Sequence, residues 1–201
     1  MRVESVAVGV YQANCYIVYD EKTMDGVIID PGSEGGKIKK MIEDANFSPK
    51  YILITHGHAD HTGAVSFIKS FYDVPVVISR KDVDIMKNGE YLFGTLSDDE
   101  KNYVYVNDND ELKAGSLNIK CIETPGHTPG GVSFVIENSI FTGDTLFFES
   151  VGRTDLSNGS TYDILNSVRN KLFKYGNDFA VYPGHGPKTT IGHEKLYNPY
   201  A

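Results

Sequence analysis

The segment His56–His61 constrains this chain more than any other, because it holds three histidines and one aspartate in six consecutive residues. It follows directly after the apolar run Tyr51–Ile54, which is typical of a buried β-strand. In an extended backbone alternate side chains lie on the same side, so His56 and His58 can hold one cation between them. His61 is out of phase with this pair and can reach a second cation beside the first. Since histidine is the commonest metal ligand, the segment predicts a metal site at the end of a strand.

Three further candidate ligands follow the same pattern. His127, Asp144 and His185 each come just after a strand-like apolar run and lie in a loop that contains glycine. Because loops at one edge of a sheet are where functional groups are usually placed, we expect these side chains to meet the first cluster. His193 stands outside the pattern and is interpreted as a solvated helix residue. Asp30 also ends a strand-like run and is predicted either to hydrogen-bond a ligand histidine or to stabilise the turn.

The histidines and aspartates together resemble the complete metal signature of the metallo-β-lactamase-fold hydrolases. Seven positions match in order: His56, His58, Asp60, His61, His127, Asp144 and His185. The resemblance extends over nearly the whole chain, and the stretches Gly152–Asp155 and Pro183–Pro187 resemble the glyoxalase II-like (hydroxyacylglutathione hydrolase-like) branch. In particular they resemble its short members, which lack the C-terminal helical domain. The resemblance implies an α/β (α+β) fold, a four-layer αββα sandwich with the metal site at the open edge between two sheets.

The resemblance also implies a set of roles for the ligands. One metal ion is assigned to His56, His58 and His127, and a second to Asp60, His61 and His185. Asp144 would bridge both ions, and Asp60 and Asp144 are the predicted catalytic residues. Seven donors without a cysteine exceed the needs of a tetrahedral structural zinc, which favours two divalent ions in a catalytic role. Zinc is expected, with iron or manganese as alternatives, and a hydroxide that bridges the ions would attack an acyl carbon.

The expected substrate is S-lactoylglutathione or a similar small-molecule acyl thioester, so the chain is predicted to be a metal-dependent thioesterase. A thiolate leaving group needs little protonation, which suits a site without an evident general acid. Arg153 is the predicted substrate-binding residue, because its planar guanidinium fits a carboxylate. The alternative is that Arg153 pairs with Asp155 and only shapes the loop. Sixteen residues follow His185, so glutathione is expected to bind weakly or to be replaced by another small thiol.

A persulfide dioxygenase is the main alternative function, because such enzymes share the element Gly152–Asp155. It would use a single iron held by His56, His127 and Asp144, a set of two histidines and one carboxylate that suits O₂ chemistry. A processing ribonuclease of the same fold is disfavoured, because it should carry a basic insertion that contacts RNA. A non-catalytic zinc module is disfavoured because seven ligands exceed structural need.

The length of the chain predicts a single domain over residues 1–201, and its 40% apolar and 23% charged residues are typical of a globular protein. The net charge of −8 argues against a nucleic-acid partner, which needs a basic surface. No run approaches the ~18 consecutive apolar residues of a membrane helix. Cys15 and Cys121 lie in strand-like runs and are interpreted as buried free thiols. With no secretory segment at the N-terminus, we expect a cytoplasmic location; the sequence does not predict the oligomeric state.

Strand-like runs and helical periodicity predict two layers of sheet with helices outside them. Strands are expected over Val3–Val8, Cys15–Tyr19, Gly26–Ile29, Tyr51–Ile54, Val74–Ile78, Tyr103–Val106, Leu117–Ile122, Val132–Ile136, Ser139–Thr142 and Phe179–Tyr182. Helices are expected over Lys37–Asn46, over Gly63–Tyr72 with Thr62 as its cap, over Arg80–Lys87 and after Ser160. Residues 88–101 form either a loop packed on the core or a lid over the substrate.

Overall fold

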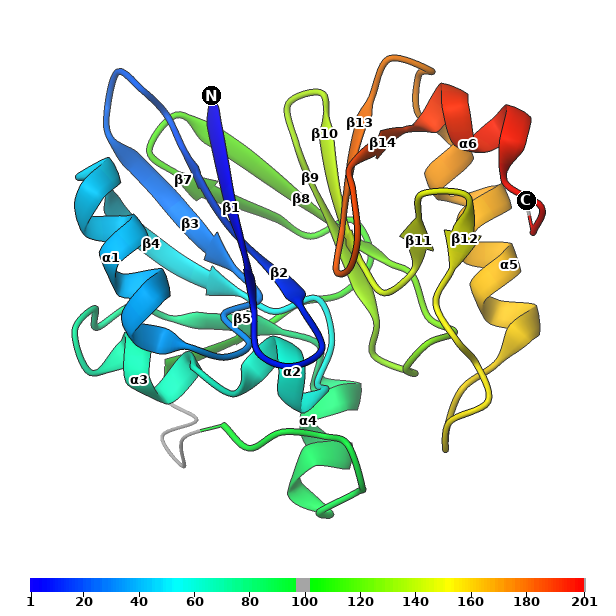
Figure 1. Cartoon of the computed structure of the whole chain (residues 1–201), viewed down its shortest axis with the longest axis horizontal. Coiled ribbons are helices and arrows are strands. Elements are labelled where there is room, and N and C mark those ends of the chain that lie inside the picture. The colour runs from blue at the N-terminus through cyan, green and yellow to red at the C-terminus, as the bar shows by residue number, and fades with distance from the viewer. Residues whose placement is uncertain (97–101, 201) are drawn as a thin grey trace.

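In the computed structural model, which describes residues 1–96 and 102–200, two six-stranded sheets lie face to face with helices on their outer sides (Figure 1). Both sheets are mixed, because each combines parallel and antiparallel pairs. The expected α/β class and four-layer αββα sandwich are therefore confirmed. In the described part of the chain, no helix has the length and apolar composition needed to cross a membrane.

The first sheet is formed by the N-terminal half of the chain. Its strands lie in the order β1 (Arg2–Val8), β2 (Ala13–Tyr19), β3 (Asp25–Ile29), β4 (Ser48–Leu53), β5 (Val76–Ile78) and β6 (Tyr103–Tyr105). β3 and β4 run parallel, with Ile29 opposite Leu53. This register brings the residues that follow the two strands, Asp30 and Thr55, to the same edge of the sheet.

The second sheet repeats this arrangement with C-terminal strands. Its order is β14 (Thr189–Thr190), β13 (Ala180–Pro183), β10 (Ser139–Gly143), β9 (Val132–Ile136), β8 (Leu117–Glu123) and β7 (Glu111–Ala114). β10 and β13 run parallel, with Gly143 opposite Pro183, so Asp144 and His185 emerge side by side. A short hairpin of β11 (Leu146–Phe147) and β12 (Ser150–Val151) follows β10.

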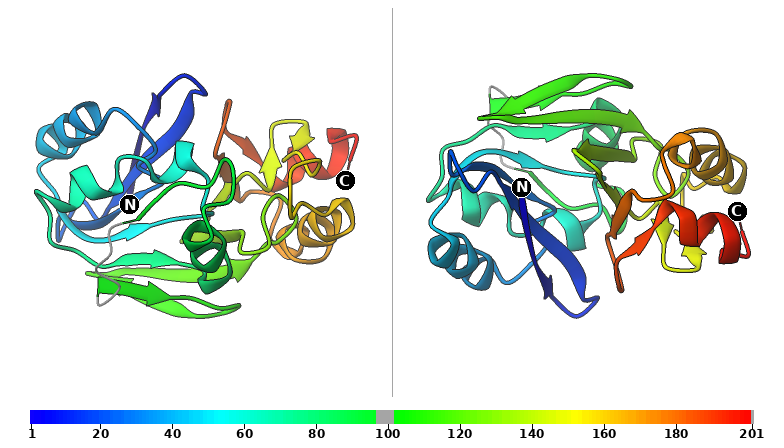
Figure 2. Two further views of the ribbon diagram at one scale, coloured as in Figure 1. Left: turned by 90° about the horizontal axis from the view of Figure 1, so that it is seen from below. Right: turned by 90° about the horizontal axis from the view of Figure 1, so that it is seen from above.

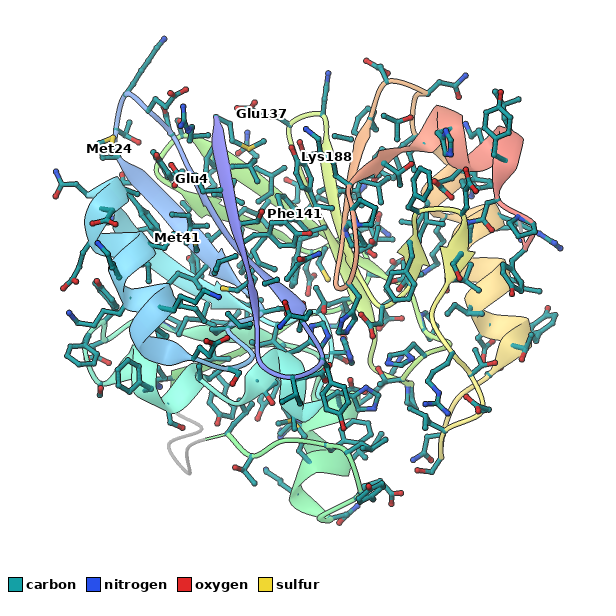
Figure 3. The ribbon with its side chains drawn as sticks, viewed as in Figure 1. Glu4, Met24, Met41, Glu137, Phe141 and Lys188 are labelled. Atoms are coloured by element: carbon teal, nitrogen blue, oxygen red, sulfur yellow. The ribbon has the colours of Figure 1, made fainter. Side chains whose placement is uncertain are left out.

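Apolar side chains from both sheets fill the space between them. Phe134 and Phe141 are among the largest fully buried side chains, and Phe141 points into this space (Figure 3). The ring of Phe141 stacks on Tyr182, with centroids 5.0 Å apart, and meets the edge of Tyr16 at 5.3 Å. Cys15 and Cys121 are buried free thiols, as expected.

Helices cover the two outer faces. On one side lie α1 (Gly35–Ala45), α2 (Ala59–Thr62), α3 (Val65–Lys69) and α4 (Arg80–Lys87); on the other lie α5 (Thr161–Asn170), the 3₁₀ turn η2 (Leu172–Lys174) and α6 (Ile191–Tyr197). The views in Figures 1 and 2 place α1 and α3 far from α5 and α6, at opposite sides of the paired sheets. Ser160 caps α5 by accepting a hydrogen bond from the backbone N–H of Asp163, which confirms the expected start of this helix.

The helix expected over Gly63–Tyr72 is present but shorter, since only α3 (Val65–Lys69) is helical in that range. It is separate from α2, which ends at Thr62, because the backbone N–H of Ala64 donates to the carbonyl of Pro31 at 2.9 Å and leaves the helical ladder. Thr62 does not cap α3; its hydroxyl donates to the carbonyl of His58 at 3.0 Å. The short strands β7, β11, β12 and β14 were not expected, since two to four residues carry too little periodicity.

Replacing Phe134 with alanine tests the core. Phe134 is fully buried between the sheets, and truncation removes its contacts and leaves a cavity. We expect the free energy of unfolding, measured by urea denaturation, to fall by about 3–5 kcal/mol. Tyr162→Ala is the control, because Tyr162 is 80% exposed and its loss should change stability by no more than about 0.5 kcal/mol. Equal losses in the two variants would contradict the described packing.

Candidate metal centre

Four loops meet at the edge between the two sheets and bring all seven predicted metal ligands together. The loop after β4 carries four of them, and the loops after β8, β10 and β13 carry one each: His56, His58, Asp60, His61, His127, Asp144 and His185. The ligand atoms form compact groups whose members lie within 4.8 Å of one another. The first sheet thus supplies the local histidine cluster and the second sheet supplies the donors opposite it.

One group consists of His56, His58 and His127, which we call the three-histidine group. Nε2 of His127 lies 2.9 Å from Nδ1 of His58, across the gap between the sheets. The ring of His56 lies 4.8 Å from that of His58 and 4.9 Å from that of His127. All three side chains are buried, so a cation held here would be largely shielded from water.

The second group consists of Asp60, His61 and His185. Oδ2 of Asp60 lies 3.3 Å from Nε2 of His185 and 3.8 Å from Nε2 of His61. The two imidazole nitrogens face each other at 3.4 Å. This group is more open than the first, because Asp60 and His185 are only partly buried.

Asp144 lies between the two groups. Its Oδ1 is 3.5 Å from Nε2 of His61, and its Oδ2 is 3.5 Å from Nε2 of both His127 and His185. His56 and His61 also form a third possible triad with Asp144, so the spacing alone does not divide the seven donors uniquely. One carboxylate nonetheless faces nitrogens of both groups, as a bridging ligand requires.

Two buried donors show that these residues fit metal ions. Nε2 of His56 and Oδ1 of Asp144 have no hydrogen-bond partner among the described residues, although both are buried. A buried polar atom without a partner costs about 1–3 kcal/mol, so native proteins rarely leave one unsatisfied. A divalent cation would bind both atoms. Its positive charge would also offset the repulsion between the lone pairs of the imidazole nitrogens that face each other.

Hydrogen bonds to the opposite ring nitrogens fix how three histidines point. Nδ1 of His61 lies 2.9 Å from Oδ2 of Asp30, that of His127 lies 2.8 Å from the carbonyl of Arg153, and that of His185 lies 3.1 Å from the carbonyl of Tyr11. An Nδ1–H that donates to oxygen leaves Nε2 free as a metal donor. These partners therefore select the tautomer that a metal site needs.

Asp30 performs both of the functions considered for it. Its buried carboxylate accepts hydrogen bonds from the backbone N–H and the hydroxyl of Thr55, at 2.8 and 2.6 Å, and it faces His61. The backbone of Asp30 is left-handed, with φ of 50°. Asp30 thus joins the ends of β3 and β4 and orients a ligand at the same time.

The histidines of the centre differ in pKa, because burial and nearby carboxylates affect them to different degrees. It lowers the pKa of His56 well below 6.5 and that of His58 to about 3, so both rings are neutral and able to donate to a metal. Burial also opposes protonation of His61, but nearby carboxylates, led by Asp144, raise its pKa to about 9. The same carboxylates that favour a proton on His61 would favour a cation bound at this position.

Gly184 lets the loops approach this closely. A Cβ at this position would lie 2.2 Å from Oδ1 of Asp144 and 2.8 Å from Cε1 of His61. Any larger residue would therefore push the carboxylate of Asp144 or the imidazole of His61 out of place. This lack of space explains why glycine precedes His185.

A cavity of about 650 Å³ opens onto the ligands. Its walls are mostly apolar and include Tyr11, Leu92, Phe147, Val151 and Leu156. Arg153 also lines it, but its guanidinium makes two hydrogen bonds to Asp155, at 2.7 and 2.9 Å. Both side chains are largely exposed, so this pair stabilises little and leaves Arg153 able to change partner.

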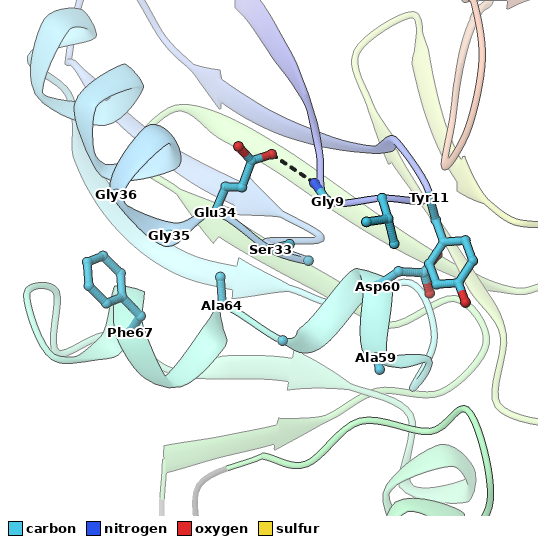
Figure 4. Close-up of a pocket in the computed structure, with 13 residues that line it drawn as sticks. Gly9, Tyr11, Ser33, Glu34, Gly35, Gly36, Ala59, Asp60, Ala64 and Phe67 are labelled. Carbon is cyan, nitrogen blue, oxygen red and sulfur yellow. Dashed lines mark hydrogen bonds between the residues drawn. The ribbon is translucent and has the colours of Figure 1, made fainter.

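A second hollow, of about 470 Å³, lies beside the first and was not expected from the sequence (Figure 4). It is bounded by the turn between β1 and β2, by the start of α1 and by the side chain of Phe67. Glu34 closes one end by accepting a hydrogen bond from the backbone N–H of Gly9 at 2.8 Å. Tyr11 and Asp60 line both hollows, so the open surface continues past the metal ligands.

The described part of residues 88–101 packs against the histidine loop. The ring of Phe93 lies 4.7 Å from that of His58, and the backbone N–H of Ala59 donates to the carbonyl of Leu92. Residues 97–101 lie outside the described residues, so a lid over the substrate stays a prediction. His193 is outside the centre, as expected, but it is only partly solvated, since Nε2 lies 3.0 Å from Glu149.

Comparisons with known proteins identify relatives over the full chain. The family model described as "Metallo-beta-lactamase superfamily" matches residues 8–185. Hydroxyacylglutathione hydrolase GloC of Haemophilus influenzae is 32% identical over 100% of this chain and 98% of its own. The probable metallo-hydrolase YqgX of Bacillus subtilis is 33% identical over 100% of this chain and 97% of its own.

Three solved structures share the fold at similar identity. The BLEG-1 B3 metallo-beta-lactamase is 31% identical, with a TM-score of 0.88 over 99% of both chains. TTHA1623 in a di-iron-bound form is 31% identical, with a TM-score of 0.86 over 98% of this chain and 100% of that one. ETHE1 from Myxococcus xanthus is 30% identical, with a TM-score of 0.83 over 99% of this chain and 84% of that one.

Metal removal should lower thermal stability, because the seven donors are assembled only in the folded state. A cation at about 100 times its dissociation constant stabilises the fold by about 2.7 kcal/mol. For a protein of this size that corresponds to a rise in Tm of about 5–10 °C. We expect this shift when zinc is added to chelator-treated protein in a calorimeter. His193→Ala should retain the shift, and an unchanged Tm in the wild type would contradict metal binding.

Proposed function

Because this chain belongs to the metallo-beta-lactamase superfamily, we propose that it is a dinuclear metal-dependent hydrolase that cleaves acyl thioesters, as glyoxalase II does. The observation that carries the proposal is Asp144, whose two oxygens face nitrogens of both ligand groups. Divalent cations, when bound, supply Lewis acidity and lower the pKa of a coordinated water to about 7. The similarity to TTHA1623 in its di-iron-bound form supports two ions and makes iron an alternative to zinc.

The chain's own residues hold and orient the reacting parts. His56, His58 and His127 supply nitrogen donors from a buried position. Asp60 and Asp144 supply the negative charge that balances the cations, and both line the cavity where a substrate would bind. The apolar wall formed by Phe147 and its neighbours excludes water from one side of the substrate, which strengthens electrostatic interactions there.

A thioester suits this cavity better than an amide. Outside the metal ligands, the described lining residues include no histidine and no carboxylic acid that could protonate a leaving group. A thiolate leaves without prior protonation, whereas an amine does not. The similarity to GloC supports S-lactoylglutathione as the substrate. We propose that Arg153, which lines the same cavity, binds one of its carboxylates. We also propose a cytoplasmic location, which the free thiols support.

A persulfide dioxygenase remains a second candidate, since the similarity to ETHE1 supports it equally. This reaction would use one iron, and we propose His56, His127 and Asp144 as its ligands. The two functions differ in metal content and in the use of O₂. Measurements of both therefore separate them.

Metal stoichiometry tests the dinuclear proposal. Zinc-reconstituted protein should approach two ions per chain by elemental analysis, because Asp144 completes both groups. Asp144→Asn keeps the shape but loses the charge, so we expect the content to fall to one ion or fewer and kcat to fall by about 100-fold or more. Asp163→Asn, in the first turn of α5, is the control and should behave as the wild type. A wild-type content capped at one under saturating zinc would exclude the dinuclear proposal.

Substrate preference tests the thioesterase. We expect the zinc-loaded protein to hydrolyse S-lactoylglutathione and to ignore a lactone, a β-lactam and glutathione persulfide. Rapid hydrolysis of the lactone or β-lactam without thioester hydrolysis would overturn the proposal. O₂ uptake on glutathione persulfide by iron-loaded protein would assign the dioxygenase function instead.

Two substitutions decide what Arg153 does. Arg153→Lys should raise KM for S-lactoylglutathione about tenfold with little change in kcat, because it removes a bidentate contact to a remote carboxylate. Asp155→Asn frees the guanidinium from its present partner and should not raise KM. If both substitutions raise KM alike, the pair only shapes the loop and Arg153 does not bind the substrate.

A further inference from the structure

A second buried aspartate, Asp82, lies close to the metal centre without being one of its ligands. It stands in the first turn of α4, and its side chain is fully buried. Its Oδ2 accepts hydrogen bonds from the backbone N–H of Gly57 and the hydroxyl of Thr128, both at 2.8 Å. Its Oδ1 accepts a third, from the backbone N–H of Gly130 at 2.7 Å.

These three donors belong to the two loops that form the three-histidine group. Gly57 stands between His56 and His58 in the loop after β4. Thr128 follows His127 directly in the loop after β8, and Gly130 is part of the same loop. A single carboxylate therefore connects a loop of the first sheet to a loop of the second, next to the point where His58 and His127 approach to 2.9 Å.

We propose that Asp82 is a positioning residue, which fixes the two loops relative to each other and so sets the geometry of the three-histidine group. This inference rests on the proposed metal centre and adds to it a residue that acts only through the backbone of the ligand loops. Loops need such support, because a flexible backbone would leave the ligand nitrogens poorly placed for one cation.

The groups around Asp82 fit a carboxylate in both size and hydrogen bonding. A Cβ on Gly130 would lie 2.4 Å from Oδ1 of Asp82, so only glycine lets this backbone approach the carboxylate. All three partners are donors, and an ionised carboxylate accepts from all of them. An asparagine would turn its NH₂ group toward at least one donor and leave that donor buried without a partner.

The hydrogen bonds of Asp82 also predict a selective effect. The second group is held by other contacts, since His61 is oriented by Asp30 and His185 by the carbonyl of Tyr11. The loss of Asp82 should therefore weaken metal binding at the three-histidine group and leave the second group nearly unchanged. A residue that only stabilised the fold would weaken both groups alike.

The experiment titrates each group separately. In a His185→Ala background only the three-histidine group keeps all its ligands, and in a His127→Ala background only the second group does. Zinc affinity is measured in each by competition with a chromophoric chelator, and cobalt absorption spectra report the ligand geometry. Asp82→Asn should lower zinc affinity at the three-histidine group by about 10- to 100-fold and change its cobalt spectrum. Affinity at the second group should change by less than about threefold, within the usual scatter of distant substitutions.

Two further variants keep the test decisive. Thr128→Val retains the side-chain shape, removes one of the three donors and is expected to give a smaller loss at the same group. Asp84→Asn is the matched control, because Asp84 is exposed on the same helix and should leave both affinities unchanged. If Asp82→Asn does not fold, Thr128→Val decides the matter, and an unchanged affinity in it overturns the inference.

The remaining outcomes are also distinct. Wild-type affinity of Asp82→Asn at both groups would overturn the positioning role, and so would an equal loss at both groups accompanied by a lower Tm. Failure of the wild type to bind zinc would overturn the proposed metal centre itself. The two failures are separated because metal binding by the wild type is measured first.

Discussion

The structure around the candidate metal centre depends on one constraint: its buried nitrogen and oxygen donors need positive charge beside them. Imidazoles and carboxylates from four loops are buried together, and two of their atoms have no hydrogen-bond partner among the described residues. Such a cluster is unfavourable unless cations complete it. The parallel pairs β3–β4 and β10–β13 make the cluster possible, because they deliver their following residues to one edge.

The residues of the candidate metal centre were predictable because each one belongs to a local pattern. The spacing of His56, His58 and His61 indicates a metal site in any fold, and the later ligands follow strand-like runs. The fold class followed from the family signature and not from periodicity, which does not distinguish sandwiches from other α/β arrangements. The division of the seven donors between two ions also came from the signature, since the spacing in the structure permits an overlapping triad.

The supporting residues were not predictable in the same way. Asp82 looks like any acidic residue in the first turn of a helix, and only the fold shows that it reaches loops 25 and 46 residues away. Phe93 and Tyr11 likewise approach the centre through tertiary contacts that leave no local periodicity. The break between α2 and α3 has the same origin, because a long-range bond to Pro31 overrides the helical preference of the segment.

The residues that face each other in the candidate metal centre lie far apart along the chain, which bears on when a metal ion can bind. His58 and His127 are 69 residues apart, and His61 and His185 are 124 apart. A disordered chain would have to close loops of that length to chelate an ion, at a large entropic cost. Pairing of the two sheets brings the same donors together without that cost. We therefore expect metal to be taken up by a chain whose sheets have already formed.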